Sequence, residues 1–308
     1  MDDYHRQLLA RGERAFGGAS IATYAGRVRA IIGPRANEYQ GLAQEAMDAL
    51  KRGETPCPMQ LAALENVIRA MRPAPLSKKG ALENLDPDVA PRFPDWDGFR
   101  SAVKPFLYSI GRVDRLPEQA IGTGFLIGPG VLVTNRHVLD LLSSGTCVLE
   151  PGQAVVRFRY EYNSPDEDPV PIIGVVAVHP SMDVALLRVE ERPFADGRRP
   201  LAIETAEARD EDPVVAIGYP LDDPTRNPLF IGAIFGSRFG VKRAAPGDVI
   251  GTRKGSVFHD CSTLGGNSGS PLLSMRTARV VGVHREGFFT YRNEAVDGAS
   301  LDALARSI

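Results

Sequence analysis

A short glycine-rich segment near the C-terminal end of the chain has the composition of a turn that exposes a nucleophile. It reads Gly265-Gly266-Asn267-Ser268-Gly269-Ser270-Pro271. Small residues on both sides of Ser268 allow a tight turn, which exposes the hydroxyl and lets neighbouring N–H groups converge on one point. Such N–H groups stabilise the oxyanion that develops when a serine attacks a carbonyl carbon. Taken alone, the segment fits an ordinary glycine-rich hairpin equally well.

Two upstream segments supply the other groups that this chemistry needs. A serine hydroxyl requires a base to take its proton, and the base requires a carboxylate that fixes its tautomer. His137 follows the apolar run of residues 131–134, and Asp183 directly precedes the apolar run of residues 184–189. The chain order His137, Asp183, Ser268 therefore supplies general base, orienting carboxylate and nucleophile. We interpret the nearby His179 as a loop residue.

From about Phe99 to its end, the chain resembles the chymotrypsin-like serine endopeptidases, and within them the bacterial branch that includes the glutamyl endopeptidases. The resemblance rests on three motifs, which are TNRHV at residues 134–138, DVALL at 183–187 and STLGGNSGSP at 262–271. It covers about two thirds of the 308 residues. It implies peptide-bond hydrolysis through an acyl-enzyme, with the backbone N–H groups of Gly266 and Ser268 as the oxyanion hole.

The same resemblance places the substrate pocket at Ser262, Thr263 and His284. Glutamyl endopeptidases hold a substrate carboxylate with a threonine and a histidine at the matching positions, so we expect a preference for acidic residues before the scissile bond. Ser262 stands where a member specific for basic residues has aspartate. The segment Arg285-Glu286-Gly287 departs from the family's aromatic-glycine-glycine wall. Glu286 would repel an acidic substrate if it faced the pocket, whereas Arg285 would attract one.

Asn267 carries a prediction about activation. Animal digestive members of the family have an aspartate at the matching position, and it pairs with a newly cut N-terminus to build the active site. An asparagine cannot form that ion pair. We therefore predict that the oxyanion hole forms without N-terminal cleavage, as in other bacterial members.

Residues 1–76 are predicted to form a small α-helical bundle. Apolar residues recur there with helical spacing, in stripes at residues 42–50 and 61–71 and more weakly at 21–32. This segment is either a folding spacer or pro-segment, or an adaptor that recruits a protein partner. Five prolines lie among charges in residues 73–97, which predicts an extended, semi-rigid linker over residues 77–98.

From residue 99 to residue 308 the hydrophobic pattern changes to a period of two, which indicates a mainly β domain. Short apolar runs separated by Gly/Pro turns fit two antiparallel β-barrels of the chymotrypsin-like class. We predict strands at residues 156–162, 172–178, 184–189, 214–217, 230–235, 257–261 and 280–283. A short closing helix is expected after Ser300, which we predict as its N-cap.

The composition excludes several classes of function. The hydrophobic fraction of 43% and the charged fraction of 24% are typical of globular proteins, and the net charge of −2 gives no reason to expect nucleic acid or a membrane as partner. The N-terminus lacks a signal-peptide pattern, and the three cysteines are scattered, so we expect reduced thiols and a cytoplasmic location. The five histidines are scattered as well, and we expect neither a metal nor a cofactor.

These observations predict a serine endopeptidase that acts on protein or peptide substrates. The N-terminal helical segment would dock the enzyme to a regulator or assembly, as in signalling or defence modules. Two alternatives remain, a catalytically silent homologue that only binds peptides and a protein-quality-control protease of the high-temperature-requirement type.

Overall fold

The computed structural model describes residues 2–17, 19–24, 26, 28–29, 33–165, 168–191, 198–225, 228–236, 238–288 and 292–308. They divide into two compact units. The helical unit contains residues 1–74, 85–94 and 224–238, and the β unit contains residues 75–84, 95–223 and 239–308. Each unit is therefore assembled from segments that are separated in the chain.

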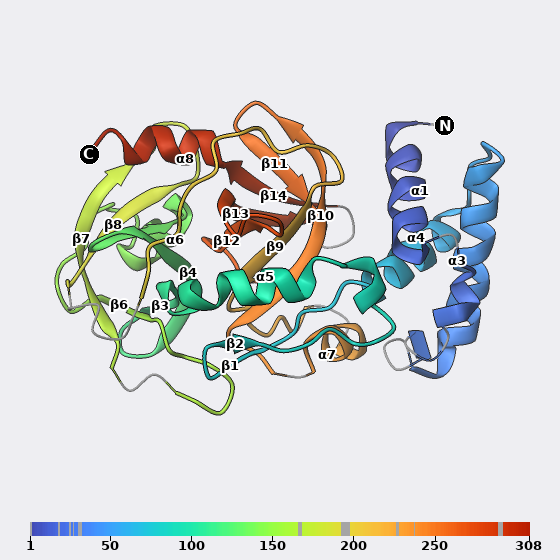
Figure 1. The fold of residues 1–308 in the computed structure, drawn as a ribbon, viewed down its shortest axis with the longest axis horizontal. Helices are drawn as coiled ribbons and strands as arrows, with labels where there is room; N and C mark the ends of the chain where they lie inside the picture. Colours follow the sequence, from blue (N-terminus) through green and yellow to red (C-terminus); the bar gives the residue numbers. More distant parts are fainter. Residues whose placement is uncertain are drawn as a thin grey trace. The chain divides into compact units, whose positions relative to one another are not determined.

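The β unit consists of two closed six-stranded barrels, in which every neighbouring pair of strands is antiparallel. The predicted chymotrypsin-like fold class is confirmed. The first barrel has the order β3-β4-β5-β8-β7-β6 and the second the order β10-β11-β14-β13-β12-β9 (Figure 1). The strands of the first are β3 (Ile110–Arg115), β4 (Gln119–Gly128), β5 (Val131–Thr134), β6 (Ala154–Arg157), β7 (Val170–Val178) and β8 (Ala185–Val189). Those of the second are β9 (Pro213–Gly218), β10 (Arg243–Arg253), β11 (Ser256–His259), β12 (Pro271–Ser274), β13 (Val280–Phe288) and β14 (Arg292–Asp297).

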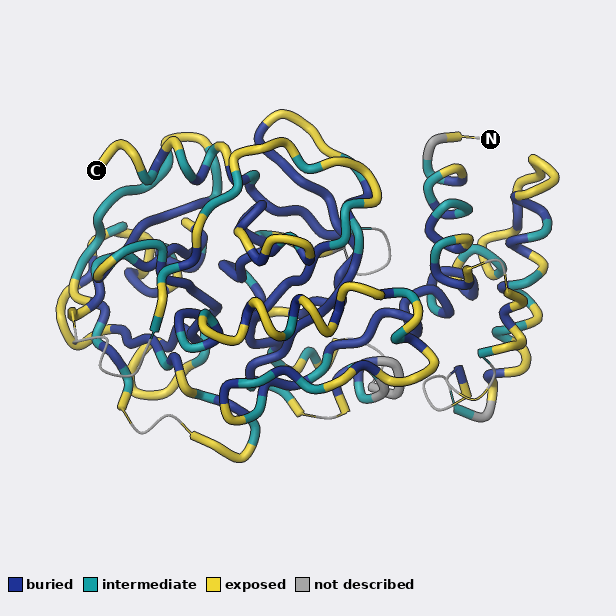
Figure 2. The backbone as a smooth tube through the Cα atoms, in the orientation of Figure 1, coloured by how far each residue is buried: buried dark blue, intermediate teal, exposed yellow. Residues whose placement is uncertain are grey.

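Much of the barrel backbone is buried, as the dark blue segments of Figure 2 show, and aliphatic residues predominate among the buried hydrophobic side chains. In the first barrel, Leu132 on β5 lies opposite Leu187 on β8, and both belong to one buried cluster with Val156 and Ile172. Burying each such side chain stabilises the fold by about 1.5–3 kcal/mol. This packing fixes the strand ends, which carry the predicted catalytic residues.

Four short helices accompany the barrels, namely α5 (Trp96–Val103), η4 (Lys104–Ser109), α6 (Arg136–Leu142) and α8 (Gly298–Ala305). The closing helix α8 is present, but the prediction of Ser300 as its N-cap was wrong. Asp297 is the N-cap, and its carboxylate accepts a 2.7 Å hydrogen bond from the Ser300 N–H. An acidic cap also stabilises the positive end of the helix dipole.

Residues 77–98, predicted as an extended linker, contain folded structure instead. The hairpin of β1 (Ser77–Lys78) and β2 (Ala81–Leu82) belongs to the β unit, as does the start of α5, whereas residues 85–94 belong to the helical unit. The buried carboxylate of Glu161 fixes the hairpin, because it accepts hydrogen bonds from the Ser77 hydroxyl at 2.6 Å and from the Gly80 N–H at 3.0 Å. The polar, proline-rich sequence did not reveal this partner, which lies far along the chain.

The helical unit contains the predicted N-terminal helices. Its elements are α1 (Asp3–Phe16), η1 (Ile21–Tyr24), η2 (Gly33–Arg35), α3 (Ala36–Lys51), α4 (Pro58–Ala70), η3 (Ala90–Arg92) and α7 (Pro228–Phe235). In the range 21–32, predicted as a weaker helix, the structure describes η1 and the α-helical residues 26, 28 and 29, and the rest of the range lies outside the described residues. In the described part of the chain, no helix has both the length and the apolar character needed to cross a bilayer.

Helix α7 corrects one prediction. We predicted a strand at residues 230–235, but they belong to a helix that lies in the chain between β9 and β10 and packs with α4. Ile231 and Phe235 are almost completely buried. A short apolar run does not distinguish a strand from a buried helix, and the packing partner decides.

Candidate active site

His137 and Asp183 come together at the edge of the first barrel. β5 ends at Thr134, Asn135 has an extended backbone, and α6 then begins, so His137 lies in the first turn of a helix. The Asn135 side-chain amide donates to the Asp183 carbonyl oxygen at 2.8 Å. The Asp183 carboxylate accepts one hydrogen bond from the His137 backbone N–H at 2.9 Å, and its other oxygen lies 2.7 Å from His137 Nδ1. The carboxylate therefore fixes both the helix start and the imidazole.

The turn before Asp183 is held by a histidine that we interpreted as a loop residue. His179 Nδ1 accepts hydrogen bonds from the backbone N–H groups of Ser181 at 3.2 Å and Met182 at 2.9 Å. The Met182 side chain packs against Gly255, where a Cβ atom would collide with the methionine methyl group. These contacts hold the turn that precedes Asp183. His179 is therefore a structural residue of the site.

The electrostatics of the site favour an ionised Asp183. Burial alone would raise the pKa of this carboxyl, but the hydrogen bonds from the His137 ring and backbone N–H, with the positive charge of Arg285, lower its pKa below the usual value. An ionised carboxylate at Nδ1 places the imidazole proton there and leaves Nε2 as an acceptor. The His137 side chain is 41% exposed, so Nε2 can be reached from solvent.

Ser268 lies beside the helix that carries His137. Its carbonyl oxygen accepts a 2.8 Å hydrogen bond from the Thr123 N–H. A Cβ atom added to Gly122 would lie 3.0 Å from that same oxygen and 3.0 Å from a methyl carbon of Val138, the residue after His137. Among the described residues, no hydrogen bond joins the Ser268 hydroxyl to His137. Catalytic hydrogen bonds commonly tighten only when substrate binds.

Two backbone N–H groups near Ser268 are available for an oxyanion. The Gly265 carbonyl accepts from the Leu221 N–H at 2.7 Å, and a trans peptide directs the Gly266 N–H to the opposite side. Gly266 has φ of 85°, and a Cβ atom there would collide with the Tyr219 carbonyl oxygen. Within the described ranges, neither the Gly266 nor the Ser268 N–H donates to a protein acceptor. The two predicted oxyanion donors are therefore both unoccupied.

The three predicted pocket residues are buried in the second barrel. Ser262, Thr263 and His284 are 6%, 7% and 3% exposed, and the His284 carbonyl accepts a 2.8 Å hydrogen bond from the N–H of Gly269, next to Ser268. The Thr263 hydroxyl lies 3.0 Å from Asn293 Oδ1. His284 is thus tied directly to the nucleophile turn.

Sequence reasoning missed His259, a second buried histidine in contact with His284. Its Nε2 lies 3.1 Å from His284 Nδ1, and the two rings pack edge to face. Burial lowers the pKa of His259 to about 4, and burial together with His259 and His137 lowers the pKa of His284 well below its usual value. Both rings are therefore neutral near pH 7. The sequence offered no signal beyond the place of His259 within a predicted strand, at residues 257–261.

The hydrogen-bond inventory favours one tautomer of this pair. His259 Nδ1 is buried and has no partner among the described residues. An orphaned buried N–H is rarer in proteins than an orphaned acceptor, so His259 carries its proton on Nε2 and donates to His284 Nδ1. His284 then carries its own proton on Nε2, which is the nitrogen that remains to donate to a ligand.

The two charged residues after His284 differ in their surroundings. Arg285 forms a 2.7 Å ion pair with Glu294, which also lies 3.4 Å from Arg253, and its charge helps to keep Asp183 ionised. Glu286 is exposed. Burial opposes ionisation of Glu294, but the Ser256 hydroxyl and Arg285 lower its pKa overall.

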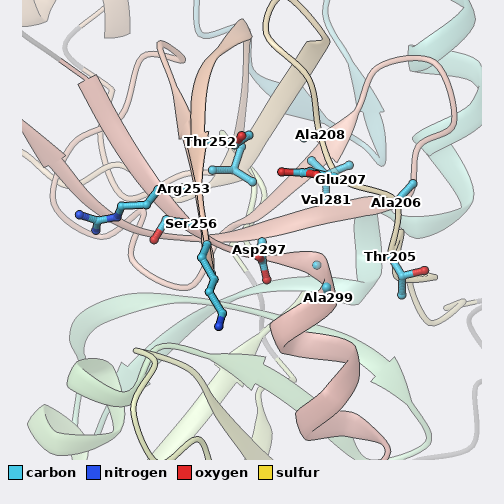
Figure 3. Close-up of a pocket in the computed structure, with 14 residues that line it drawn as sticks. Thr205, Ala206, Glu207, Ala208, Thr252, Arg253, Ser256, Val281, Asp297 and Ala299 are labelled. Carbon is cyan, nitrogen blue, oxygen red and sulfur yellow. The ribbon is translucent and has the colours of Figure 1, made fainter.

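A separate pocket of about 380 Å³ lies on the second barrel, between the β10–β11 hairpin, residues 205–208 and the start of α8 (Figure 3). None of the predicted site residues lines it. Its wall includes Gly255, the hairpin residue that contacts Met182. In the described part of the chain, no group of three His, Cys, Asp or Glu side chains could hold a metal ion.

Comparisons with known proteins find similar proteins among the serine proteases. The family model for the trypsin-like peptidase domain matches residues 122–283. A probable serine protease of Lysobacter enzymogenes is 25% identical over 69% of this chain and 66% of its own length. A protease Do-like 2, chloroplastic, of Arabidopsis thaliana is 30% identical over 62% of this chain, but the match spans only 27% of that longer protein. The serine endoprotease from Yersinia pestis shares the fold, with a TM-score of 0.50 and 18% identity over 68% of this chain and 65% of that one.

Proposed function

Because the chain belongs to the trypsin-like peptidase family, we propose that it is a serine endopeptidase that uses His137, Asp183 and Ser268 as its triad. The observation that carries the proposal is the two-point hydrogen bond of Asp183 to the His137 ring and backbone, beside a serine turn with two available N–H groups. This is the arrangement that activates a serine and stabilises its oxyanion.

The proposed reaction follows from these positions. Ser268 Oγ attacks the scissile carbonyl carbon while His137 Nε2 takes the hydroxyl proton, and the N–H groups of Gly266 and Ser268 bind the developing oxyanion. The C–N bond then breaks as His137 returns the proton to the leaving amine. Water, activated by the same imidazole, hydrolyses the acyl-enzyme and releases the second product. Asp183 remains ionised throughout and stabilises the imidazolium.

We further propose that the pocket prefers an acidic side chain before the scissile bond, as in the glutamyl endopeptidases. The support is the neutral histidine pair, in which His259 orients His284 so that its Nε2–H is the remaining donor. Arg285 adds positive charge near the site, although Glu294 neutralises much of it. A carboxylate held by neutral donors avoids the cost of burying a permanent cation.

A peptide library digested by the wild type, with Ser268→Ala as the matched control, tests both statements. We expect cleavage only by the wild type, with Glu or Asp enriched before the cut. Cleavage by neither protein contradicts the peptidase assignment. Cleavage mainly after Arg, Lys or large apolar residues contradicts the acidic preference and leaves the peptidase assignment intact.

We also propose that the helical unit regulates the peptidase. The support is the path of the chain between β9 and β10, because residues 224–238 belong to the helical unit while Leu221, just before them, bonds to the nucleophile loop. On one flank, the Leu221 N–H donates to Gly265 at 2.7 Å, and Pro220 accepts a 2.7 Å bond from Gly240 on the other flank. A Cβ atom on Gly266 would lie 2.6 Å from Leu221 Cγ. Helix α7 begins seven residues after Leu221, so movement of α7 would reach the oxyanion hole through this short segment of chain.

Substitution of the buried α7 side chains tests this regulatory role. Ile231→Ser and Phe235→Ser remove apolar anchors of α7 from the helical unit. We expect kcat to fall at least about threefold, since the Leu221 bond to Gly265 becomes less well held. The affinity of a peptide for the same variants in a Ser268→Ala background should stay unchanged. Equal kcat in wild type and variants would contradict the coupling.

A second candidate role is the degradation of unfolded proteins, which the similarity to the Do-like protease favours. Such an enzyme would digest a reduced, unfolded protein rapidly and with little side-chain preference. Rapid cleavage of short acidic peptides, with slow cleavage of an unfolded protein that lacks acidic residues, would exclude this role.

A further inference from the structure

Thr123 connects the two residues that supply the oxyanion donors. Its hydroxyl is completely buried, accepts a 3.2 Å hydrogen bond from the Tyr219 N–H and donates a 2.7 Å hydrogen bond to the Gly266 carbonyl. Its backbone N–H donates to the Ser268 carbonyl at 2.8 Å. One residue of the first barrel therefore holds the carbonyl groups of both Gly266 and Ser268. Thr134 steadies it in turn, because the Thr134 hydroxyl donates to the Thr123 carbonyl at 2.8 Å.

The conformation of Gly266 needs such fixation. It lacks a side chain and has φ of 85°. Glycine adopts positive and negative φ about equally readily, so its own backbone does not hold it in this conformation. The Leu221 N–H fixes the peptide group before Gly266, and the Thr123 hydroxyl fixes the peptide group after it. With either bond lost, rotation about the Gly266 backbone would redirect its N–H away from the oxyanion position.

The surroundings of the Thr123 hydroxyl leave no simple substitute for it. A Cβ atom on Gly218 would lie 3.0 Å from this hydroxyl, 2.6 Å from Asn267 Oδ1 and still closer to the Ser270 hydroxyl, which donates to Asn267 Oδ1 at 3.4 Å. The Asn267 side chain is already engaged, with its amide 3.3 Å from the Leu264 carbonyl. Loss of the hydroxyl would leave a buried N–H and a buried carbonyl unsatisfied, and the loop would have to rearrange to satisfy them.

We infer that Thr123 is a positioning residue whose hydroxyl keeps the Gly266 N–H in the oxyanion hole. The inference rests on the proposed peptidase function. It predicts a defect in the chemical step and not in substrate binding, because the hydroxyl touches the loop and not the substrate. The threonine is thus needed for its hydroxyl, and serine should replace it while valine, which has the same shape, should not.

The test compares Thr123→Val and Thr123→Ser with the wild type in steady-state hydrolysis of one peptide substrate. We expect Thr123→Val to lower kcat about 10- to 100-fold with KM within about threefold, a smaller loss than removal of an oxyanion donor itself. Thr123→Ser should stay within about threefold of the wild type. Ser109→Ala is the matched control, because it removes another buried hydroxyl with a 2.7 Å bond to a backbone carbonyl, remote from the nucleophile loop in sequence.

Inhibition by a peptidyl boronate, which mimics the tetrahedral oxyanion, separates positioning from general destabilisation. Its Ki for Thr123→Val should rise by the same factor by which kcat/KM falls, and the affinity of a substrate peptide in a Ser268→Ala background should not change. If the valine variant does not fold, Thr123→Ala, which places no methyl group against the Gly266 carbonyl, decides instead.

Three results would overturn the inference. They are wild-type kcat in the valine variant, equal losses in the valine and serine variants, or a loss confined to KM. An inactive wild type would instead refute the proposed function on which the inference depends, so the two failures are distinguishable.

Discussion

Replacing His259 with glutamine should make the protein less sensitive to acid. His259 is fully buried beside His284, and burial lowers its pKa to about 4. In the unfolded chain a histidine titrates near pH 6.5. Between these values the unfolded state binds a proton that the folded state does not, so the free energy of unfolding falls as the pH falls.

The size of the effect follows from the two pKa values. Each unit of difference is worth about 1.4 kcal/mol, so a shift from 6.5 to about 4 represents about 3 kcal/mol in full. Between pH 7 and pH 4.5, the titration of His259 should lower the free energy of unfolding of the wild type by about 2 kcal/mol. Glutamine cannot titrate, but its side-chain amide can still donate to His284 Nδ1 as the histidine does. His259 also lowers the pKa of His284, so its removal reduces the His284 contribution in the same direction.

Urea unfolding of both proteins at pH 7 and pH 4.5 measures this difference directly. The decrease in the free energy of unfolding between the two pH values should be smaller by about 2 kcal/mol in His259→Gln. The titrating groups other than His259 and His284 are shared and cancel in the comparison, and the change at His284 adds to the expected difference. An equal decrease in both proteins would refute the assignment of a neutral buried His259. His259→Phe, which cannot donate to His284, should in addition weaken the preference for acidic peptides.

Three substitutions near the site carry further predictions. Asp183→Asn should lower kcat by about 10⁴-fold, because the amide no longer fixes the imidazole tautomer, and peptide hydrolysis at unchanged melting temperature checks this. Gly266→Ala should lower kcat at least about 10²-fold, since its Cβ would meet a backbone carbonyl and displace an oxyanion donor, whereas Gly265→Ala, with open space around its Cβ, should retain near-wild-type kcat. Gly255→Ala should lower kcat severalfold by displacing the methionine that precedes Asp183. Gly152→Ala, which has a similar positive φ but no atom near its Cβ, is the control for backbone strain alone, and equal kcat in these two variants would contradict the reasoning.

The sequence was sufficient to predict the double-barrel fold and the meeting of His137 with Asp183. Both depend on short-range patterns, namely alternating apolar strands and a polar residue at a strand end, within a family arrangement that fixes how the ends meet. The strand predicted at residues 156–162 extends only to Arg157, because the chain turns there toward the hairpin that Glu161 holds. The alternation of apolar and polar residues along a strand does not predict where the chain turns away from it.

The other differences arise from partners far apart in the chain. Residues 230–235 form a helix because they pack with α4, and a run of apolar residues has no periodicity that indicates this. His259 was not predicted as a site residue because its role depends on its contact with His284, which lies 25 residues later in the chain. The role of Thr123 is equally invisible in the sequence, since its hydroxyl bonds to a loop 143 residues away.

The side-chain contacts of Asn267 bear on the prediction about activation. Its amide lies 3.3 Å from the Leu264 carbonyl and its oxygen 3.4 Å from the Ser270 hydroxyl, so partners within the loop engage both ends. These contacts support the prediction that the oxyanion hole forms without a new N-terminus.

The most direct measurement is the site at which a fluorophosphonate reacts covalently with the protein. The intact, uncleaved chain is labelled, and the modified residue is then identified by peptide mass spectrometry. Activated serine hydroxyls react with this probe, and unactivated ones do not. A single adduct on Ser268, lost in Ser268→Ala and formed far more slowly in His137→Ala, is the expected result. A correctly folded wild type that forms no adduct, or an adduct on another residue, would contradict the proposed triad.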